Sequence, residues 1–84
     1  MLENQQAVLR IVGDVLGLKG AIAAMDERSP LLGAIPELDS MAVLSIITML
    51  EEQFGFSVDD DEIDGATFAT VGTLTAFVNG KLHA

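Results

Sequence analysis

Thirteen acidic and four basic side chains give the 84-residue chain a formal net charge of −9, and half of its residues are hydrophobic. The hydrophobic content excludes a disordered tail, and the negative field argues against nucleic-acid binding because it repels phosphate backbones. The sequence contains no cysteine, no secretory signal and no apolar run of the roughly 18 residues that a membrane span requires. We therefore expect one cytoplasmic domain over residues 1–84.

The first predicted element is a helix over residues 3–16. Apolar side chains recur there at helical spacing, at Val8, Leu9, Val12, Val15 and Leu16. Gly17 can end this helix, and the glycines and prolines of residues 17–38 predict a long first loop with a short helical turn around residues 21–25. Four apolar side chains are expected to pin the loop across the helices: Leu31, Leu32, Ile35 and Leu38.

The clearest predicted helix covers residues 40–54. Its expected inner face consists of Val43, Ile46, Ile47, Leu50 and Phe54. Its expected outer face includes Ser45, Thr48, Glu51 and Glu52. Gly55 follows at the position where a left-handed glycine often ends a helix.

Two further elements are expected after this helix. Residues 59–64, with the sequence DDDEID, predict a short acidic turn or helix. Residues 70–82 predict the last helix, with Thr70 as its N-cap. Its inward residues are expected to be Val71, Leu74, Phe77, Val78 and Leu82. Because no segment shows strand-like alternation, the fold class is all-α: a small bundle of three main helices plus one short helix, with a long first loop.

The start of the second long helix carries two candidate N-cap residues side by side, Asp39 and Ser40. Both residue types are preferred N-caps, because their side-chain oxygens accept hydrogen bonds from the free N–H groups of the first turn. Either residue could be present for capping alone. One oxygen suffices, however, so capping by Asp39 would leave the Ser40 hydroxyl facing solvent. Met41 and Leu44 lie on the same outer side, which predicts a contact patch for a protein partner.

A self-activated catalytic role for Ser40 is not supported. A nucleophilic serine needs a base, and the sole histidine, His83, lies next to the C-terminus. The GLKG sequence at residues 17–20 lacks the spacing of a phosphate-binding loop. A serine that another enzyme modifies fits these observations better, since the partner then supplies the base and any metal.

Several of these features together resemble the acyl carrier proteins. The resemblance lies in Asp39-Ser40-Met41 at a helix start, LEEQFG at residues 50–55, the short acidic turn after it, and TVGTLTAFV at residues 70–78. It implies an acyl-carrier-like bundle in which Ser40 carries 4′-phosphopantetheine, moved from coenzyme A by a phosphopantetheinyl transferase with Mg²⁺. The thiol of that group would hold acyl intermediates as thioesters, and the carrier itself would catalyse nothing.

The resemblance also implies roles for the neighbouring residues. Asp39 would support the transferase and its metal. The partner-binding residues would be Met41, Leu44, Thr48, Glu51 and Glu52. The two glutamates would meet basic docking surfaces on downstream synthase enzymes, and the carrier is expected to be a monomer.

The chain departs from the usual family pattern around Ser40. Pro36-Glu37 stands where Leu-Gly is frequent, Ala42 and Ser45 replace acids, and Thr48 replaces a methionine. These departures fit a dedicated carrier with its own loading ligase or transferase as well as they fit a carrier of the usual fatty-acid synthase enzymes. The expected setting of the acyl carrier is lipid, polyketide or exopolysaccharide-related biosynthesis. Residues 29–43, SPLLGAIPELDSMAV, also resemble stand-alone carriers of exosortase and exopolysaccharide systems. Two alternatives stay open: an aminoacyl or peptidyl carrier loaded by an adenylating ligase, and an unmodified helical interaction module.

The acidic run raises a metal hypothesis. Asp60, Glu62, Asp64 and Gly65 match positions one, three, five and six of a calcium-binding loop. Position twelve should be a bidentate glutamate but is Val71. We therefore expect no metal site here and interpret the run as a solvated acidic helix start.

Overall fold

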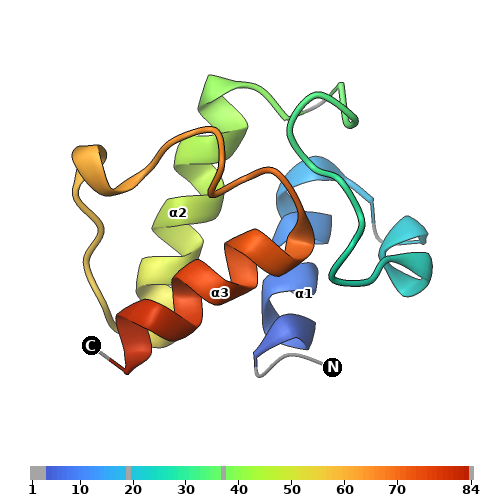
Figure 1. Cartoon of the computed structure of the whole chain (residues 1–84). Coiled ribbons are helices and arrows are strands. Elements are labelled where there is room, and N and C mark those ends of the chain that lie inside the picture. Colours follow the sequence, from blue (N-terminus) through green and yellow to red (C-terminus); the bar gives the residue numbers. More distant parts are fainter. Residues whose placement is uncertain (1–3, 19, 37, 84) are drawn as a thin grey trace.

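A computed structural model describes residues 4–18, 20–36 and 38–83, and it shows an all-α fold (Figure 1). Its elements are α1 (Gln5–Leu16), the 3₁₀ turn η1 (Ala21–Ala24), α2 (Ser40–Phe54), the 3₁₀ turn η2 (Asp60–Glu62) and α3 (Val71–Leu82). The all-α bundle, the short turn in the first loop and the short acidic element are thus confirmed. No helix in the described part of the chain is long and apolar enough to cross a membrane.

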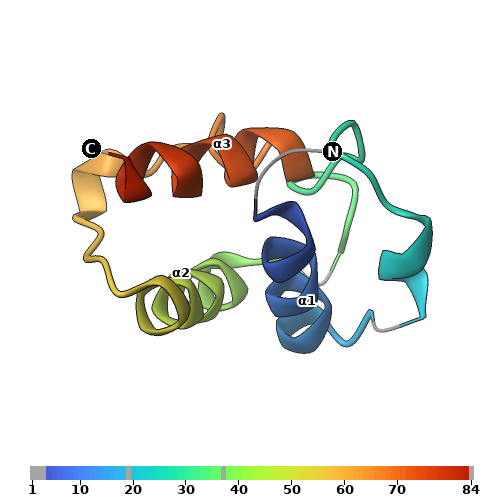
Figure 2. The same cartoon turned by 90° about the horizontal axis from the view of Figure 1, so that it is seen from below.

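Helix α1 is the central element of the bundle. It packs closely against both α2 and α3, whereas α2 and α3 approach each other less closely. In Figure 2, α3 lies across α1 and α2 on one side of them. The predicted stripe of α1 is buried apart from Val15, which is half-buried. Gly17 ends the helix with a φ of 70°. The helix begins at Gln5, and residue 3 of the predicted span lies outside the described residues.

The bounds of α2 agree with the predicted span because capping signals stand at both ends. Asp39 has extended backbone and accepts a hydrogen bond from the Ala42 N–H at 2.9 Å. Gly55 adopts a φ of 76°, and its N–H donates to the Glu51 carbonyl, which closes the last turn. On the inner face, Ile46, Ile47 and Leu50 are buried, while Val43 and Phe54 are half-buried against the core.

Helix α3 begins with a reciprocal cap. Thr70 accepts from the Thr73 N–H at 3.1 Å, and the Thr73 hydroxyl accepts from the Thr70 N–H at 2.9 Å. Among the predicted inward residues, Val71, Leu74 and Val78 are buried and Phe77 is half-buried. The prediction for Leu82 is wrong, because it is the last residue of the helix, beyond the buried stripe, and is exposed.

The long first loop is fixed to the start of α3 by four backbone hydrogen bonds. The N–H groups of Leu31 and Leu32 donate to the carbonyls of Ala69 and Phe68, at 3.0 and 2.9 Å. In return, the N–H groups of Val71 and Gly72 donate to the carbonyls of Ser29 and Glu27. These bonds fix the path of the loop after η1, where it has no further helix.

This path decides which loop residues reach the core. Leu31 and Leu38 are buried and Ile35 is half-buried, as predicted. The prediction that Leu32 also points inward is wrong, since 46% of its side chain is exposed. Leu31 directly follows the antiparallel bridge between Pro30 and Thr70, and Leu32 begins the turn that comes after it. With Leu31 in the core, Leu32 faces outward.

Candidate functional site

The Ser40 hydroxyl stands exposed on the first turn of α2. Because Asp39 accepts the bond from Ala42, the helix start is capped without the serine side chain. No hydrogen bond joins the Ser40 hydroxyl to any residue that the structure describes. As expected, Asp39 caps the helix and the Ser40 hydroxyl stays exposed to solvent.

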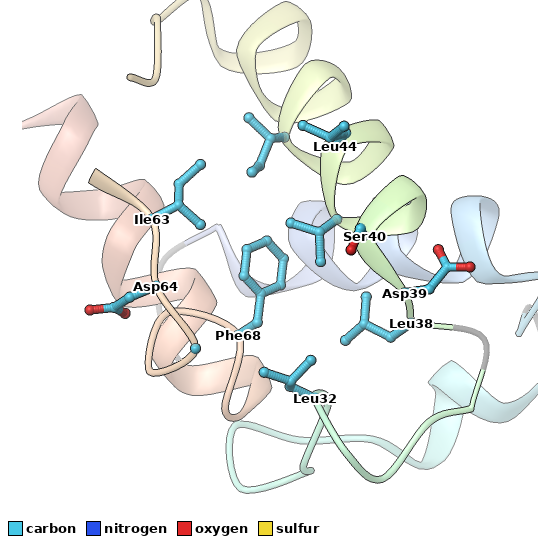
Figure 3. A pocket seen from close by; sticks show the side chains of 11 residues that line it. Leu32, Leu38, Asp39, Ser40, Leu44, Ile63, Asp64 and Phe68 are labelled. Atoms are coloured by element: carbon cyan, nitrogen blue, oxygen red, sulfur yellow. The ribbon is translucent and has the colours of Figure 1, made fainter. Parts of the chain in front are cut away.

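A groove of about 630 Å³ opens beside Ser40, between α2 and the segment that leads to α3 (Figure 3). Phe68 and Ile63 face α2 across it. Its walls are mostly apolar and consist of Leu32, Leu38, Asp39, Ser40, Val43, Leu44, Ile47, Ile63, Asp64, Gly65 and Phe68. This lining contains no histidine, lysine or arginine, and its two carboxylates, Asp39 and Asp64, each accept a hydrogen bond from a backbone N–H. The arrangement suits covalent attachment and apolar contact rather than self-catalysed chemistry.

The outer face of α2 is apolar near Ser40 and acidic only at its far end. Met41 is 71% exposed and Leu44 is 55% exposed. Thr48 is exposed, and its hydroxyl donates to the Leu44 carbonyl at 2.9 Å. Glu52 is exposed. The four residues lie on the predicted side of the helix.

Glu51 differs from the other residues of that face. It is half-buried, and its carboxylate accepts a hydrogen bond from the Val58 N–H at 2.8 Å. This contact anchors the chain after Gly55 to the last turns of α2. The carboxylate is therefore engaged within the chain, which the helical pattern alone did not indicate.

The acidic segment uses its carboxylates for local hydrogen bonds. Glu62 pairs with Lys81 at 2.8 Å and accepts from the Asp59 N–H at 2.7 Å. The Asp59 N–H first, and then Lys81, lower the pKa of Glu62 from its ordinary value. Asp64 accepts from the Thr67 N–H at 3.1 Å.

Two of the acids weighed as calcium ligands, Glu62 and Asp64, thus already bond to protein donors. The side chain of a third, Asp60, lies outside what the structure describes. Among the described residues, no three or more His, Asp or Glu side chains form a group that could hold a metal ion.

Of the groove residues, Asp39, Ser40 and Leu44 were expected at the site. Leu32 and Ile63 are two of those that were not. They come from loops whose course depends on long-range contacts, such as the bond from the Leu32 N–H to the Phe68 carbonyl. No local periodicity marks either residue. The groove itself was likewise not visible in the sequence, because three separate segments form it.

Comparison with known proteins agrees with this geometry. The family model described as "Phosphopantetheine attachment site" matches residues 6–78. The solution NMR structure of a holo acyl carrier protein from Nitrosomonas europaea is similar to the chain, with 53% sequence identity and a TM-score of 0.92, over 99% of this chain and 100% of that one. No curated protein matches.

The Ser40 hydroxyl is exposed and has no hydrogen bond to a described residue, and the open groove beside it leaves room for a long tether. The residues present thus fit the group that this family carries. The chain therefore belongs to the family of acyl carrier proteins, which are non-catalytic carriers with covalently attached 4′-phosphopantetheine.

Proposed function

We propose that Ser40 is the residue that carries the 4′-phosphopantetheine group. The observation that supports this is its hydroxyl, which is exposed, unbonded among the described residues and located at the rim of an apolar groove. In the attachment step the Ser40 oxygen forms a phosphoester bond with the phosphopantetheine phosphorus, the phosphoanhydride bond of coenzyme A breaks, and adenosine 3′,5′-bisphosphate leaves. The hydroxyl proton passes to a base of the transferase, since the groove lining has no histidine or lysine and its carboxylates, Asp39 and Asp64, already accept backbone hydrogen bonds.

We further propose that the cargo is an acyl chain in lipid, polyketide or exopolysaccharide-related biosynthesis. When bound, the group supplies a thiol that holds such a chain as a thioester. The apolar groove walls formed by Val43, Ile47 and Phe68 favour an acyl chain over an amino acid. The likeness to a holo acyl carrier protein supports the same choice.

The partners would be a phosphopantetheinyl transferase, a loading ligase or acyltransferase, and downstream synthase enzymes. Asp39 would support the transferase and its metal, since its second carboxylate oxygen lies outside the capping bond. Met41, Leu44 and Thr48 would contact these enzymes. Glu52 would face basic residues of the downstream synthase enzymes, and Glu51 would contribute less because its carboxylate already accepts from the Val58 N–H.

Intact-protein mass spectrometry tests the attachment. After incubation with coenzyme A and a broad-specificity transferase, the chain should gain one phosphopantetheine, and Ser40→Ala should gain none. Ser45→Ala is the matched control, because Ser45 is an exposed serine on the same helix and its loss should leave loading intact. A wild-type chain that several transferases leave unmodified would favour the unmodified interaction module. The mass of the group on protein from its native cell then identifies the cargo.

A further inference from the structure

We infer that the transferase that loads Ser40 contacts the carrier through an apolar collar formed by Leu32, Met41 and Leu44, and not through ion pairs along α2. The inference rests on the proposed role of Ser40. It adds a loop residue, Leu32, to the docking surface and specifies the chemistry of the partner: a nonpolar recess beside the entrance to its active site.

The exposed hydrophobic side chains are not scattered over the molecule. Of the four large ones among the described residues, three surround Ser40 and the fourth, Leu82, ends α3. Leu32 and Leu44 line the same groove as Ser40. Met41 follows Ser40 and shares a helix face with Leu44 three residues later. A cluster of this kind around a reactive group is typical of an interaction site.

The collar is held in place before any partner arrives. Its Leu32 follows the buried Leu31, and the Leu32 N–H donates to the Phe68 carbonyl at 2.9 Å. The other two members project from the first two turns of a capped helix. Because the backbone under all three residues is fixed, docking costs little conformational entropy.

Charged side chains are missing from the part of α2 that the partner must approach. The sequence has no charged residue from Ser40 to Leu50 and no lysine or arginine from residue 29 to 80. The first acid of the helix, Glu51, is bonded to Val58, and Glu52 lies roughly 18 Å along the axis from Ser40.

Each of the two carboxylates nearer the groove already uses one oxygen in a bond to a backbone N–H. Asp39 accepts from the Ala42 N–H and Asp64 accepts from the Thr67 N–H. In Figure 3 the Asp64 carboxylate points away from the groove. The net charge of −9 can steer a basic partner from a distance, but the surface in contact around Ser40 is apolar.

The test is the kcat/KM for loading the full apo chain with coenzyme A by a broad-specificity phosphopantetheinyl transferase, at about 0.05 and 0.5 M NaCl. Leu32→Ser, Met41→Ser and Leu44→Ser should each lower kcat/KM about tenfold, by the same factor at both salt concentrations, because apolar contacts are not screened. Leu82→Ser is the matched control and should stay within about twofold of wild type. Glu52→Gln should have a smaller effect that disappears at high salt.

The outcomes separate this inference from the proposed function. Circular dichroism melting first confirms that each variant is folded. If wild type is loaded on Ser40 and the collar variants behave like Leu82→Ser, the transferase does not dock on the collar. The assignment of Ser40 as the attachment site is then unaffected. A loss in Glu52→Gln that equals the loss in the collar variants would also overturn the apolar contact. A wild-type chain that is never loaded would overturn the attachment site itself.

Discussion

At the scale of single residues, Gly72 sets how closely the first loop can approach α3. Its N–H donates to the Glu27 carbonyl at 2.8 Å. A Cβ atom added at this position would lie 2.7 Å from the same oxygen, closer than any normal contact. The absence of a side chain at Gly72 thus allows the hydrogen bonds that fix the loop, and with it the groove residue Leu32.

We expect Gly72→Ala to lower the free energy of unfolding by about 1–3 kcal/mol, because the loop must move away and strain its backbone bonds. Gly80→Ala on the same helix is the matched control. A Cβ at Gly80 would meet nothing within 4 Å, so this change should raise stability by about 0.5–1 kcal/mol. Urea unfolding of both variants measures the difference. Equal stabilisation by both would show that the loop does not pack against α3 as described.

The exposure and bonding of a side chain could be predicted from the sequence where they depend on neighbouring residues. The free hydroxyl of Ser40 followed from the presence of Asp39 as a second cap. The exposure of Leu32 and the engagement of Glu51 could not be predicted in this way. Each depends on a residue distant in the chain or beyond the helix end, Phe68 in one case and Val58 in the other.

At the scale of elements, Asp39 decides where α2 begins and how Ser40 is presented. We expect Asp39→Ala to lose the capping bond and about 1 kcal/mol of stability, and Asp39→Asn to stay within a few tenths of wild type because asparagine caps as well. If the carboxylate also supports the transferase, both variants should load slowly. Thermal melting and loading rates, measured side by side, separate the two roles. If Asp39→Asn is well folded and loads at the normal rate, the negative charge of Asp39 plays no part in the recognition of Ser40.

A second element-level contact joins η2 to α3 through Glu62 and Lys81. The Asp59 N–H and Lys81 lower the pKa of Glu62, so its carboxylate stabilises the folded state fully above the ordinary value of 4.5. This contribution is lost as the pH falls below 4.5 and through the lowered folded-state pKa. We expect Lys81→Met to raise the pKa of Glu62 towards its ordinary value, as an NMR titration of the side chain would measure.

The shift should be partial, because the bond from the Asp59 N–H remains in Lys81→Met. Arg28→Met is the control, since it removes a positive charge from the exposed first loop. The pKa of Glu62 should stay at its wild-type value there. An unchanged pKa in Lys81→Met would mean that the ion pair is not populated in solution.

Helix spans could be predicted better than loop paths for a physical reason. Periodicity and end signals such as Thr70 and Gly55 act over a few residues, so they fix α2 and α3 locally. The groove has walls from α2, the first loop and the segment before α3. Its shape depends on how these segments meet, which local patterns do not encode.

At the scale of the whole molecule, α1 is the structural centre, because it packs closely against both α2 and α3, while the groove lies between α2 and the segments that come before α2 and α3. A core truncation such as Leu50→Ala should therefore affect the entire fold, at a cost of about 2–5 kcal/mol.

Around this core, thirteen acids face only four bases. One ion pair, between Lys81 and Glu62, lies among the described residues. The surface charge is thus largely uncompensated, which favours encounter with basic partners but opposes compaction.

We therefore expect the melting temperature to rise with ionic strength, by several degrees between about 0.02 and 0.5 M NaCl, because salt screens the repulsion among the acids. The double variant Asp59→Asn/Asp61→Asn removes two charges from the acidic segment. It should melt higher than wild type at low salt and gain less from added salt. Calorimetry on both proteins supplies the comparison. A melting temperature that falls or stays constant with salt would indicate that attractive pairs, not repulsion, dominate the electrostatics of the folded carrier.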